Sequence, residues 1–313
     1  MEDIDFSTPG WLITYYHVIG TVSLLFDAFA IYLVLFKSSK IDNFRYFLLN
    51  FQIACSLTDI HLTFLMQPVP LYPLLSGFAV GLLPSHFGAS CHTCLTLIIF
   101  LLIYQIGSMI LCFIRKHQAI AGTLGGGRQM PSLLVASLHA FFLAYTAIVT
   151  GFWSVLSVPE AEQLGFVLRT LPDYYHLFEN LPNFSIYEAN RDFLVLVIFA
   201  VSGGILAFFV LISTLFNIFR LLAMLKMKIS SSNYQKHRVA IRSLMAQFAT
   251  SSVCFVPPIF FVFVVLIGIS RAQVIVEFLL VIACFHSTLN VIVLVITFPP
   301  YRKFVKWIIF RNE

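Results

Sequence analysis

The stretch Phe193-Leu-Val-Leu-Val-Ile-Phe199 decides the class of fold, because every one of its side chains is apolar. A strand of a membrane β-barrel alternates apolar and polar residues along its length. A run without alternation is typical of a helix in hydrocarbon, where each backbone N–H and C=O must be satisfied inside the segment. Phe260-Phe-Val-Phe-Val-Val-Leu266 is a second run of the same kind, so it predicts another such helix.

Seven long apolar stretches can be marked along the chain, and each has the roughly 20 residues that a helix needs to cross a bilayer. Only Asp27, Asp59 and Glu277 are charged residues within them. The sequence therefore predicts an all-α, polytopic membrane protein, a single seven-transmembrane helix bundle over residues 1–313. The spans are expected at about 12–36, 46–66, 92–114, 131–156, 193–219, 243–268 and 272–298.

The end of the second span allows two interpretations. The prolines of Gln67-Pro-Val-Pro70 kink or end a helix near Met66. Residues 71–83 are apolar but too short for an eighth span. They either extend the second span beyond a kink or form a re-entrant turn.

The composition excludes several classes of protein. The chain is 59% hydrophobic and 11% charged, whereas a soluble domain is about 45–50% apolar and roughly 25% charged. So little polar surface cannot cover a globule in water. A soluble enzyme, a nucleic-acid-binding protein and a disordered chain are therefore excluded, and the bilayer is the first partner that we predict.

The chain contains no recognisable catalytic or cofactor motif. His86, Cys91, His92 and Cys94 lie close together in the sequence, but their spacing matches no standard zinc site. The glycine-rich segment 122–127 follows no strand and lacks the Lys-Ser/Thr ending of a phosphate-binding loop. We predict no enzymatic activity, no cofactor and no metal.

The basic residues are distributed unequally between the two sides of the predicted bundle. Of the 19 lysines and arginines, only Arg169, Arg191 and Arg271 fall on one side, together with the acidic N-terminal segment 1–5. Because basic residues are retained in the cytoplasm, the N-terminus is predicted outside and the C-terminus inside. The N-x-S/T sequon at Asn183 then lies in a long outer loop, 157–192, and is a predicted glycosylation site.

The cysteines do not describe a disulfide framework. Cys91 and Cys94 stand at the predicted outer end of the third span, and no cysteine in an outer loop is available to pair with them. The other cysteines lie within spans, where they are expected to be small buried residues, namely Cys55, Cys112, Cys254 and Cys284.

Three segments resemble the nematode serpentine chemoreceptors, a group of G-protein-coupled receptors. They are Lys40-Ile-Asp-Asn-Phe-Arg45, the segment from Leu57-Thr-Asp-Ile-His61 through Met66-Gln-Pro-Val-Pro-Leu-Tyr-Pro73, and Phe298-Pro-Pro-Tyr-Arg302. The match looks closest to serpentine receptor class I, near class H, and covers the whole chain. The resemblance implies a chemosensory receptor in the plasma membrane of a sensory cell. Its partners would be an extracellular small molecule or peptide and a heterotrimeric G protein.

The resemblance to rhodopsin-like receptors is incomplete at two positions. The third span ends in Phe113-Ile-Arg-Lys-His-Gln118, with no acidic residue before Arg115, and the seventh ends in Pro-Pro-Tyr-Arg instead of Asn-Pro-x-x-Tyr. The switching mechanism of rhodopsin is therefore not carried over. The inner ends of spans three, five and six supply the candidate G-protein-facing residues, namely Arg115, Lys116, Lys226, Lys228, Lys236, Arg238 and Arg242.

Polar residues inside the spans are the candidates for an intramembrane switch. Asp59 resembles the second-helix aspartate of rhodopsin-like receptors, which belongs to a polar network linked to switching. The alternative is a neutral acid, hydrogen-bonded to His61 or to a hydroxyl, with a structural role only. Asp27 and Asn290 could complete a polar seam with Asp59, or simply hold helices together.

Three further features carry expectations. Glu277 starts the last span, where it either reaches out to water or meets a ligand. Pro257 and Pro258 predict a kink in the sixth span, either a hinge or a static bend. Residues 301–311 mix basic with aromatic side chains and predict a short amphipathic helix on the inner leaflet.

Two alternatives to a receptor remain at this stage. A transporter or channel is the first, although transporters are usually built from repeated halves and seven spans do not divide equally. A seven-helix membrane protein that does not signal is the second. The sequence identifies neither the ligand, nor the G protein, nor the oligomeric state.

Overall fold

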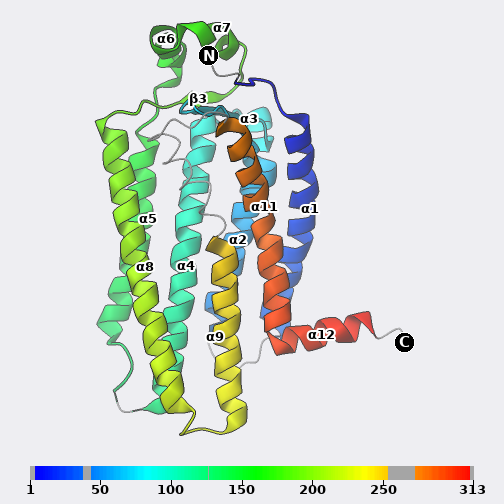
Figure 1. Cartoon of the computed structure of the whole chain (residues 1–313), viewed down its shortest axis with the longest axis vertical. Helices are drawn as coiled ribbons and strands as arrows, with labels where there is room; N and C mark the ends of the chain where they lie inside the picture. The colour runs from blue at the N-terminus through cyan, green and yellow to red at the C-terminus, as the bar shows by residue number, and fades with distance from the viewer. Residues whose placement is uncertain (1–3, 38–43, 126, 253–271, 311–313) are drawn as a thin grey trace.

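The computed structural model describes residues 4–37, 44–125, 127–252 and 272–310. Within these ranges six helices are long and apolar enough to cross a membrane. The first two are α1 (Gly10–Tyr32) and α2 (Phe44–Ile60), each extended by a π-helical turn, η1 (Leu33–Lys37) and η2 (His61–Met66). The other four are α4 (Cys91–Leu124), α5 (Ser132–Ser154), α8 (Arg191–Leu225) and α11 (Ala272–Thr297). Figure 1 shows them side by side in one bundle, so the predicted helical membrane fold is confirmed.

The sixth predicted span, 243–268, is only partly described. Helix α9 (Ser231–Ser251) includes its beginning, and most of the remaining residues lie outside the described ranges, as do Pro257 and Pro258. Helices α4 and α8 continue beyond the predicted inner ends at 114 and 219. The predictions stopped where apolar residues stop, but a helix continues into water as long as its backbone hydrogen bonds form.

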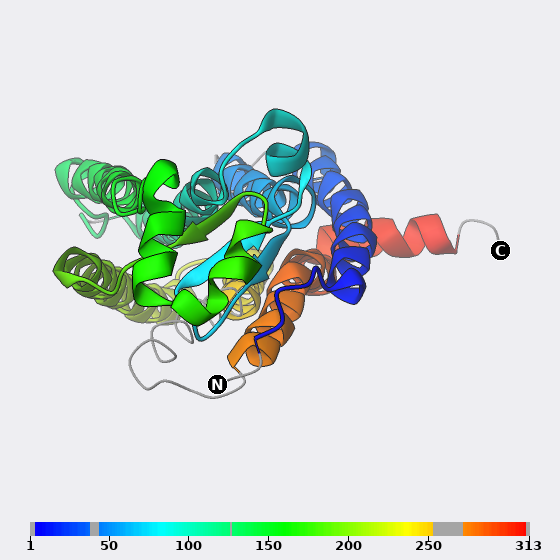
Figure 2. The same ribbon diagram turned by 90° about the horizontal axis from the view of Figure 1, so that it is seen from above.

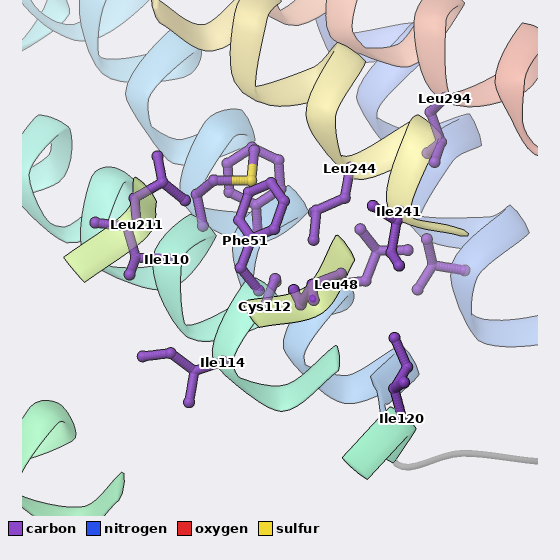
Figure 3. Close-up of a cluster of buried hydrophobic side chains, with 14 of the residues drawn as sticks. Leu48, Phe51, Ile110, Cys112, Ile114, Ile120, Leu211, Ile241, Leu244 and Leu294 are labelled. Atoms are coloured by element: carbon purple, nitrogen blue, oxygen red, sulfur yellow. The ribbon is translucent and has the colours of Figure 1, made fainter. Parts of the chain in front are cut away.

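Helix α4 lies at the centre of the bundle, because it contacts α2, α5, α8 and α9. Figure 3 shows the main hydrophobic cluster around it, in which Phe51 of α2 lies among side chains of α4, α8 and α9. These side chains come from the inward face of each helix. The outward faces carry exposed Leu, Ile and Phe, as expected for helices surrounded by lipid.

One end of the bundle is covered by a small cap that the sequence analysis did not predict. Residues after the second span form the strands β1 (Pro68–Pro70) and β2 (Ser76–Ala79), so they neither extend the span nor form a re-entrant turn. Strand β3 (Phe184–Ile186) from the loop 157–192 pairs antiparallel with β2, with Phe78 opposite Phe184. Figure 2 shows this sheet and the green helices above it lying across the end of the bundle.

The cap has a hydrophobic core of its own. The loop 157–192 also forms α6 (Glu160–Thr170), η3 (Pro172–Tyr174) and α7 (Tyr175–Glu179), while α3 (Leu82–Phe87) follows β2. Phe178 of α7 is buried and meets the ring of Phe6 edge-on, with 5.1 Å between centroids. The N-terminal segment is therefore packed against the cap.

The opposite end carries the C-terminal helix. Helix α12 (Pro299–Ile309) turns away from the axis of the bundle and extends to one side (Figure 1). Tyr301 is buried at the root of α12, and the ammonium of Lys37 lies 4.2 Å from the ring centroid of Phe304. Trp307 in the far part of α12 and Phe310 just after its end are exposed. This is the geometry expected of an amphipathic helix that lies along a membrane surface.

A substitution at Gly81 tests the junction between the cap and the second span. A Cβ at this position would lie 2.6 Å from the carbonyl carbon and oxygen of Leu65, and backbone atoms cannot move aside as a flexible side chain can. We expect Gly81→Ala to lower the free energy of unfolding by about 1–3 kcal/mol. The measurement is the midpoint of thermal unfolding of the purified protein in detergent.

Gly151→Ala is the matched control, because an added Cβ there meets nothing within 4 Å. Alanine favours a helix interior over glycine by roughly 0.5–1 kcal/mol, so this variant should unfold at the same or a higher temperature. A midpoint for Gly81→Ala as high as that of Gly151→Ala would contradict the position of the cap.

Candidate functional site

A polar network is buried in the middle of the bundle and joins its first and last described spans. The hydroxyl of Ser287 on α11 donates to Oδ1 of Asp27 on α1 at 2.7 Å, and the amide of Gln52 on α2 approaches the same oxygen at 3.4 Å. One turn away, the hydroxyls of Ser23 and Thr288 share a 2.8 Å hydrogen bond. These contacts connect three helices through groups that have no access to water.

Asn290 and Asp59 extend the same network. The amide of Asn290 approaches Sγ of Cys55 at 3.7 Å, and Cys55 lies one helical turn before Asp59 on α2. The hydroxyls of Ser23 and Ser287 face the Asp59 carboxyl, and the Asp27 carboxyl is close enough to interact with it electrostatically. The structure thus places the candidates Asp27, Asp59 and Asn290 around one interior region between α1, α2 and α11.

Asp59 faces His286 and not His61, whereas the alternative of a hydroxyl partner agrees with the position of Ser23 and Ser287. Asp59 is 2% exposed, and its Oδ1 lies 3.4 Å from Nδ1 of His286. His61 points instead to α4, with Nε2 2.8 Å from the carbonyl of Cys94. Residues two apart on a helix do not face each other, so Asp59 and His61 were poor candidates for a pair.

The protonation of His286 follows from its neighbours. Nδ1 lies 2.8 Å from the carbonyl oxygen of Ala283, so this nitrogen carries the hydrogen that the carbonyl accepts. Nε2 is then an acceptor, and it faces the amide nitrogen of Gln105 on α4 at 3.4 Å. Gln105 therefore brings the central helix into the network.

Sequence reasoning missed five members of this network: Ser23, Gln52, Gln105, Ser287 and Thr288. Hydroxyl and amide residues are common enough in membrane helices that none stood out alone. A usable signal was the run of polar residues from His286 to Thr288, followed by Asn290, inside an apolar span.

Glu277 lies under the cap rather than in water. Its side chain is 8% exposed, so the expectation that it reaches out to solvent is wrong for this structure. One turn earlier on α11, the side chain of Gln273 bonds both the backbone N–H and the backbone carbonyl of Asp5, at 2.9 and 2.7 Å. The N-terminal segment is thereby held over the end of α11, and the carboxyl of Asp5 interacts with that of Glu277.

An aromatic cluster fixes the cap to the third and fourth spans. Nδ1 of His92 and the hydroxyl of Tyr187 are 2.9 Å apart, and the rings of Trp153 and Tyr187 are 4.9 Å apart. Burial raises the pKa of Tyr187 above its usual value, because a phenolate would lose its hydration there. Tyr187 therefore stays neutral and can keep this hydrogen bond.

The end of the bundle opposite the cap is called the basic end below. It exposes some of the predicted G-protein-facing residues and buries Lys116. Lys116 is 6% exposed, with its ammonium 4.9 Å from the ring centroid of Phe44, and the guanidinium of Arg115 lies 5.8 Å from that of Phe47. The exposed members are Lys226, Lys228, Lys236, Arg238 and Arg242. Among the described residues, no three His, Cys, Asp or Glu side chains are arranged to hold a metal ion.

A family model described as serpentine type 7TM GPCR chemoreceptor Sri matches residues 2–305. The chain belongs to this family. The fold of the chemoreceptor is similar to the crystal structure of squid rhodopsin, with a TM-score of 0.59 over 100% of this chain and 89% of the rhodopsin chain. The two are 12% identical, so this likeness concerns the fold alone. A comparison with curated proteins gave no match.

The bond between Ser287 and Asp27 can be tested by removing the hydroxyl. The Ser287→Ala variant removes the 2.7 Å donor to Oδ1 of Asp27 and leaves the longer 3.4 Å contact with Gln52. A buried acceptor that loses its donor costs about 1–3 kcal/mol, so we expect the midpoint of thermal unfolding to fall accordingly.

Ser202→Ala is the control, because this exposed hydroxyl on α8 bonds only to the carbonyl of Phe199 on its own helix, at 2.9 Å. It should change stability by less than about 0.5 kcal/mol. Identical midpoints for the two alanine variants would mean that the bond between α1 and α11 does not stabilise the bundle.

Proposed function

We propose that the chemoreceptor detects an extracellular small molecule or peptide at the plasma membrane of a sensory cell and signals to a heterotrimeric G protein. The family match over residues 2–305 is the observation that carries this function. The similarity of the fold to squid rhodopsin agrees with this proposal. The three segments quoted above favour a nematode receptor of class I, near class H.

The capped end is proposed to face the outside of the cell. The opposite end carries the exposed basic residues of α9 and α12, which the cytoplasmic side of a membrane retains. The cap carries most of the described acidic residues and Asn183. In the folded cap, the side-chain amide of Asn183 approaches the carbonyl of Pro84 at 3.5 Å and Ser185 is buried, so a glycan would have to be added before the cap closes.

Orientation is tested with tags in intact cells. An N-terminal tag should be labelled without permeabilisation and a C-terminal tag should not. Glycosidase should shift the apparent mass of the wild type, and Asn183→Gln should abolish the shift. Labelling of the C-terminal tag in intact cells would reverse the orientation and remove the basis for G-protein contact at the basic end.

The proposed G-protein contact uses the exposed basic residues rather than Lys116. Attraction to anionic lipid, about 1 kcal/mol for each basic residue, also accounts for such residues. Attraction to lipid depends on charge alone, so it is unchanged when Arg is replaced by Lys. A specific contact made by the planar guanidinium does not survive this exchange.

Asp59 is proposed to act in the transition between resting and signalling states. The carboxyl sits where α1, α2 and α11 meet and faces His286, which in turn faces Gln105 of α4. A shift of any of these helices changes which donors surround the carboxyl. Glu277 is a second candidate, for contact with the ligand, because it lies buried directly beneath the cap.

The double substitution Arg238→Lys and Arg242→Lys tests the contact with the G protein. The test uses an agonist identified by screening cells that also express a promiscuous G protein. We expect surface expression to stay unchanged and agonist-stimulated nucleotide exchange to fall roughly five- to tenfold, which corresponds to about 1 kcal/mol or slightly more.

Arg169→Lys with Arg191→Lys is the matched control, since both arginines are exposed at the capped end. It should leave nucleotide exchange unchanged. If the Arg238 and Arg242 variant kept the nucleotide exchange of the wild type, these basic residues would act only through attraction to anionic lipid. Ligand-driven flux or current without any G protein would instead favour a transporter or channel.

A further inference from the structure

A pocket opens on the flank of the bundle, and it reaches Tyr46 and Phe47 in the first turn of α2, toward the basic end. It has a volume of about 340 Å³ and lies between α2, α4 and α5. Gly107 and Phe142 belong to its buried floor, while Tyr46, Asn50 and Leu143 are exposed at its rim. This volume is within the range of small-molecule sites, which starts at roughly 300 Å³.

We expect the rim of the flank pocket to face lipid. All three helices that form it are candidate membrane spans. Asn50 is six residues into α2, which places it roughly 9 Å along the helix at 1.5 Å per residue. A molecule could therefore enter from the bilayer without crossing the cap.

Two polar side chains of the pocket retain unused hydrogen-bonding capacity. The hydroxyl of Tyr104 donates to Oδ1 of Asn50 at 2.8 Å, and the Asn50 amide nitrogen donates to no other described residue. Nδ1 of His139 lies 2.7 Å from the carbonyl oxygen of Val135, so Nδ1 carries the hydrogen and Nε2 is an acceptor without a partner among the described residues.

Such groups are costly where no water can reach them. Hydrocarbon neither donates nor accepts hydrogen bonds, so a polar group that faces it is expected to be paired. Polar side chains at membrane depth accordingly mark binding sites more often than side chains of the same type in water-exposed positions. A bound molecule that supplies both an acceptor and a donor would satisfy Asn50 and His139.

The walls of the pocket indicate that the ligand is aromatic and uncharged. Phe47, Tyr104 and Phe142 contribute aromatic surface, and none of the residues that line the pocket is an acid, a lysine or an arginine. We propose that the flank pocket binds an uncharged aromatic molecule with a hydroxyl group, of the alkylphenol class, that arrives through the bilayer. Its ring would pack against these walls, and its hydroxyl would accept from the Asn50 amide or donate to Nε2 of His139.

The floor of the pocket contacts the buried polar network. Ser108, which lines the pocket, donates to the backbone carbonyl of Gln105 at 2.8 Å, and the Gln105 side chain faces His286. A bound phenol would thus rest against the turn of α4 that reaches the network. The proposal concerns binding and does not depend on the chemoreceptor coupling to a G protein.

Photolabelling of the purified full-length protein in lipid nanodiscs tests the proposal. The probe is a diazirine derivative of 2,6-diisopropylphenol, and its comparison compound is the corresponding methyl ether, which cannot donate a hydrogen bond. We expect saturable labelling of peptides from α2, α4 and α5, with an affinity for the phenol roughly five- to tenfold above that for the ether. Asn50→Leu should weaken labelling by the phenol by a similar factor.

Two variants close the pocket and one serves as their control. Gly107→Leu adds a side chain that must extend toward Phe142, because a Cβ there lies 3.3 Å from Cβ of Phe142. Leu143→Trp fills the rim from an exposed position and keeps the test valid if the first variant misfolds. Both should abolish saturable labelling, whereas Gly204→Leu on α8, where an added Cβ meets nothing within 4 Å, should not.

Three results would overturn the proposal. The first is labelling spread evenly over all lipid-facing helices without saturation. The second is saturable labelling that persists in Leu143→Trp. The third is efficient disulfide cross-linking of Asn50→Cys between two chains together with absence of labelling in α2, α4 and α5, which would show that a second copy covers the rim.

Discussion

The bilayer core offers no hydrogen bonds, and this constraint determines how the bundle is built. A polar side chain in a span is therefore stabilised by a partner on another helix or on its own backbone. The 2.7 Å bond between Ser287 and Asp27 is the shortest link between α1 and α11 within the network. Around it gather the amides of Gln52 and Gln105 and the imidazole of His286. The polar residues thereby fix which faces of four helices turn inward.

The cap is stabilised in a different way. It closes one end of the bundle and has a hydrophobic core of its own. Its strands come from two loops far apart in the chain, and the N-terminal segment packs on it through Phe6. With the capped end proposed to face outward, a water-soluble ligand would bind at the cap or pass it. A lipid-soluble one has a second route through the flank pocket between α2, α4 and α5.

The sequence was sufficient for the helices but not for the cap. Apolar runs such as 193–199 identify a membrane helix directly, because the composition of each span is dictated by its solvent. Strands β1 and β2 have only three and four residues, and β1 includes Pro68 and Pro70, so neither shows a strand pattern. The pairing of Phe78 with Phe184 joins residues that no local rule connects.

The candidate site could be predicted only in part from the sequence. Charged residues in a span are rare, so Asp27 and Asp59 were identifiable, and a polar seam with Asn290 was one of the two alternatives. Their partners depend on how each helix is rotated. Rotation follows from packing, and on α2 it is altered by the π-helical turn that begins at His61. The burial of Glu277 likewise depends on the N-terminal segment that Gln273 holds above it.

The central claim is that this buried network belongs to the signalling switch and does more than hold the bundle together. The most direct measurement is a dose–response curve of agonist-stimulated nucleotide exchange for wild type and Asp59→Asn at equal surface expression. The substitution keeps the shape of the side chain and replaces the carboxyl group by a neutral amide. The account predicts a shift of at least about fivefold in agonist potency, the lower range of an allosteric coupling. Superimposable curves would contradict it and leave Asp59 with a structural role only.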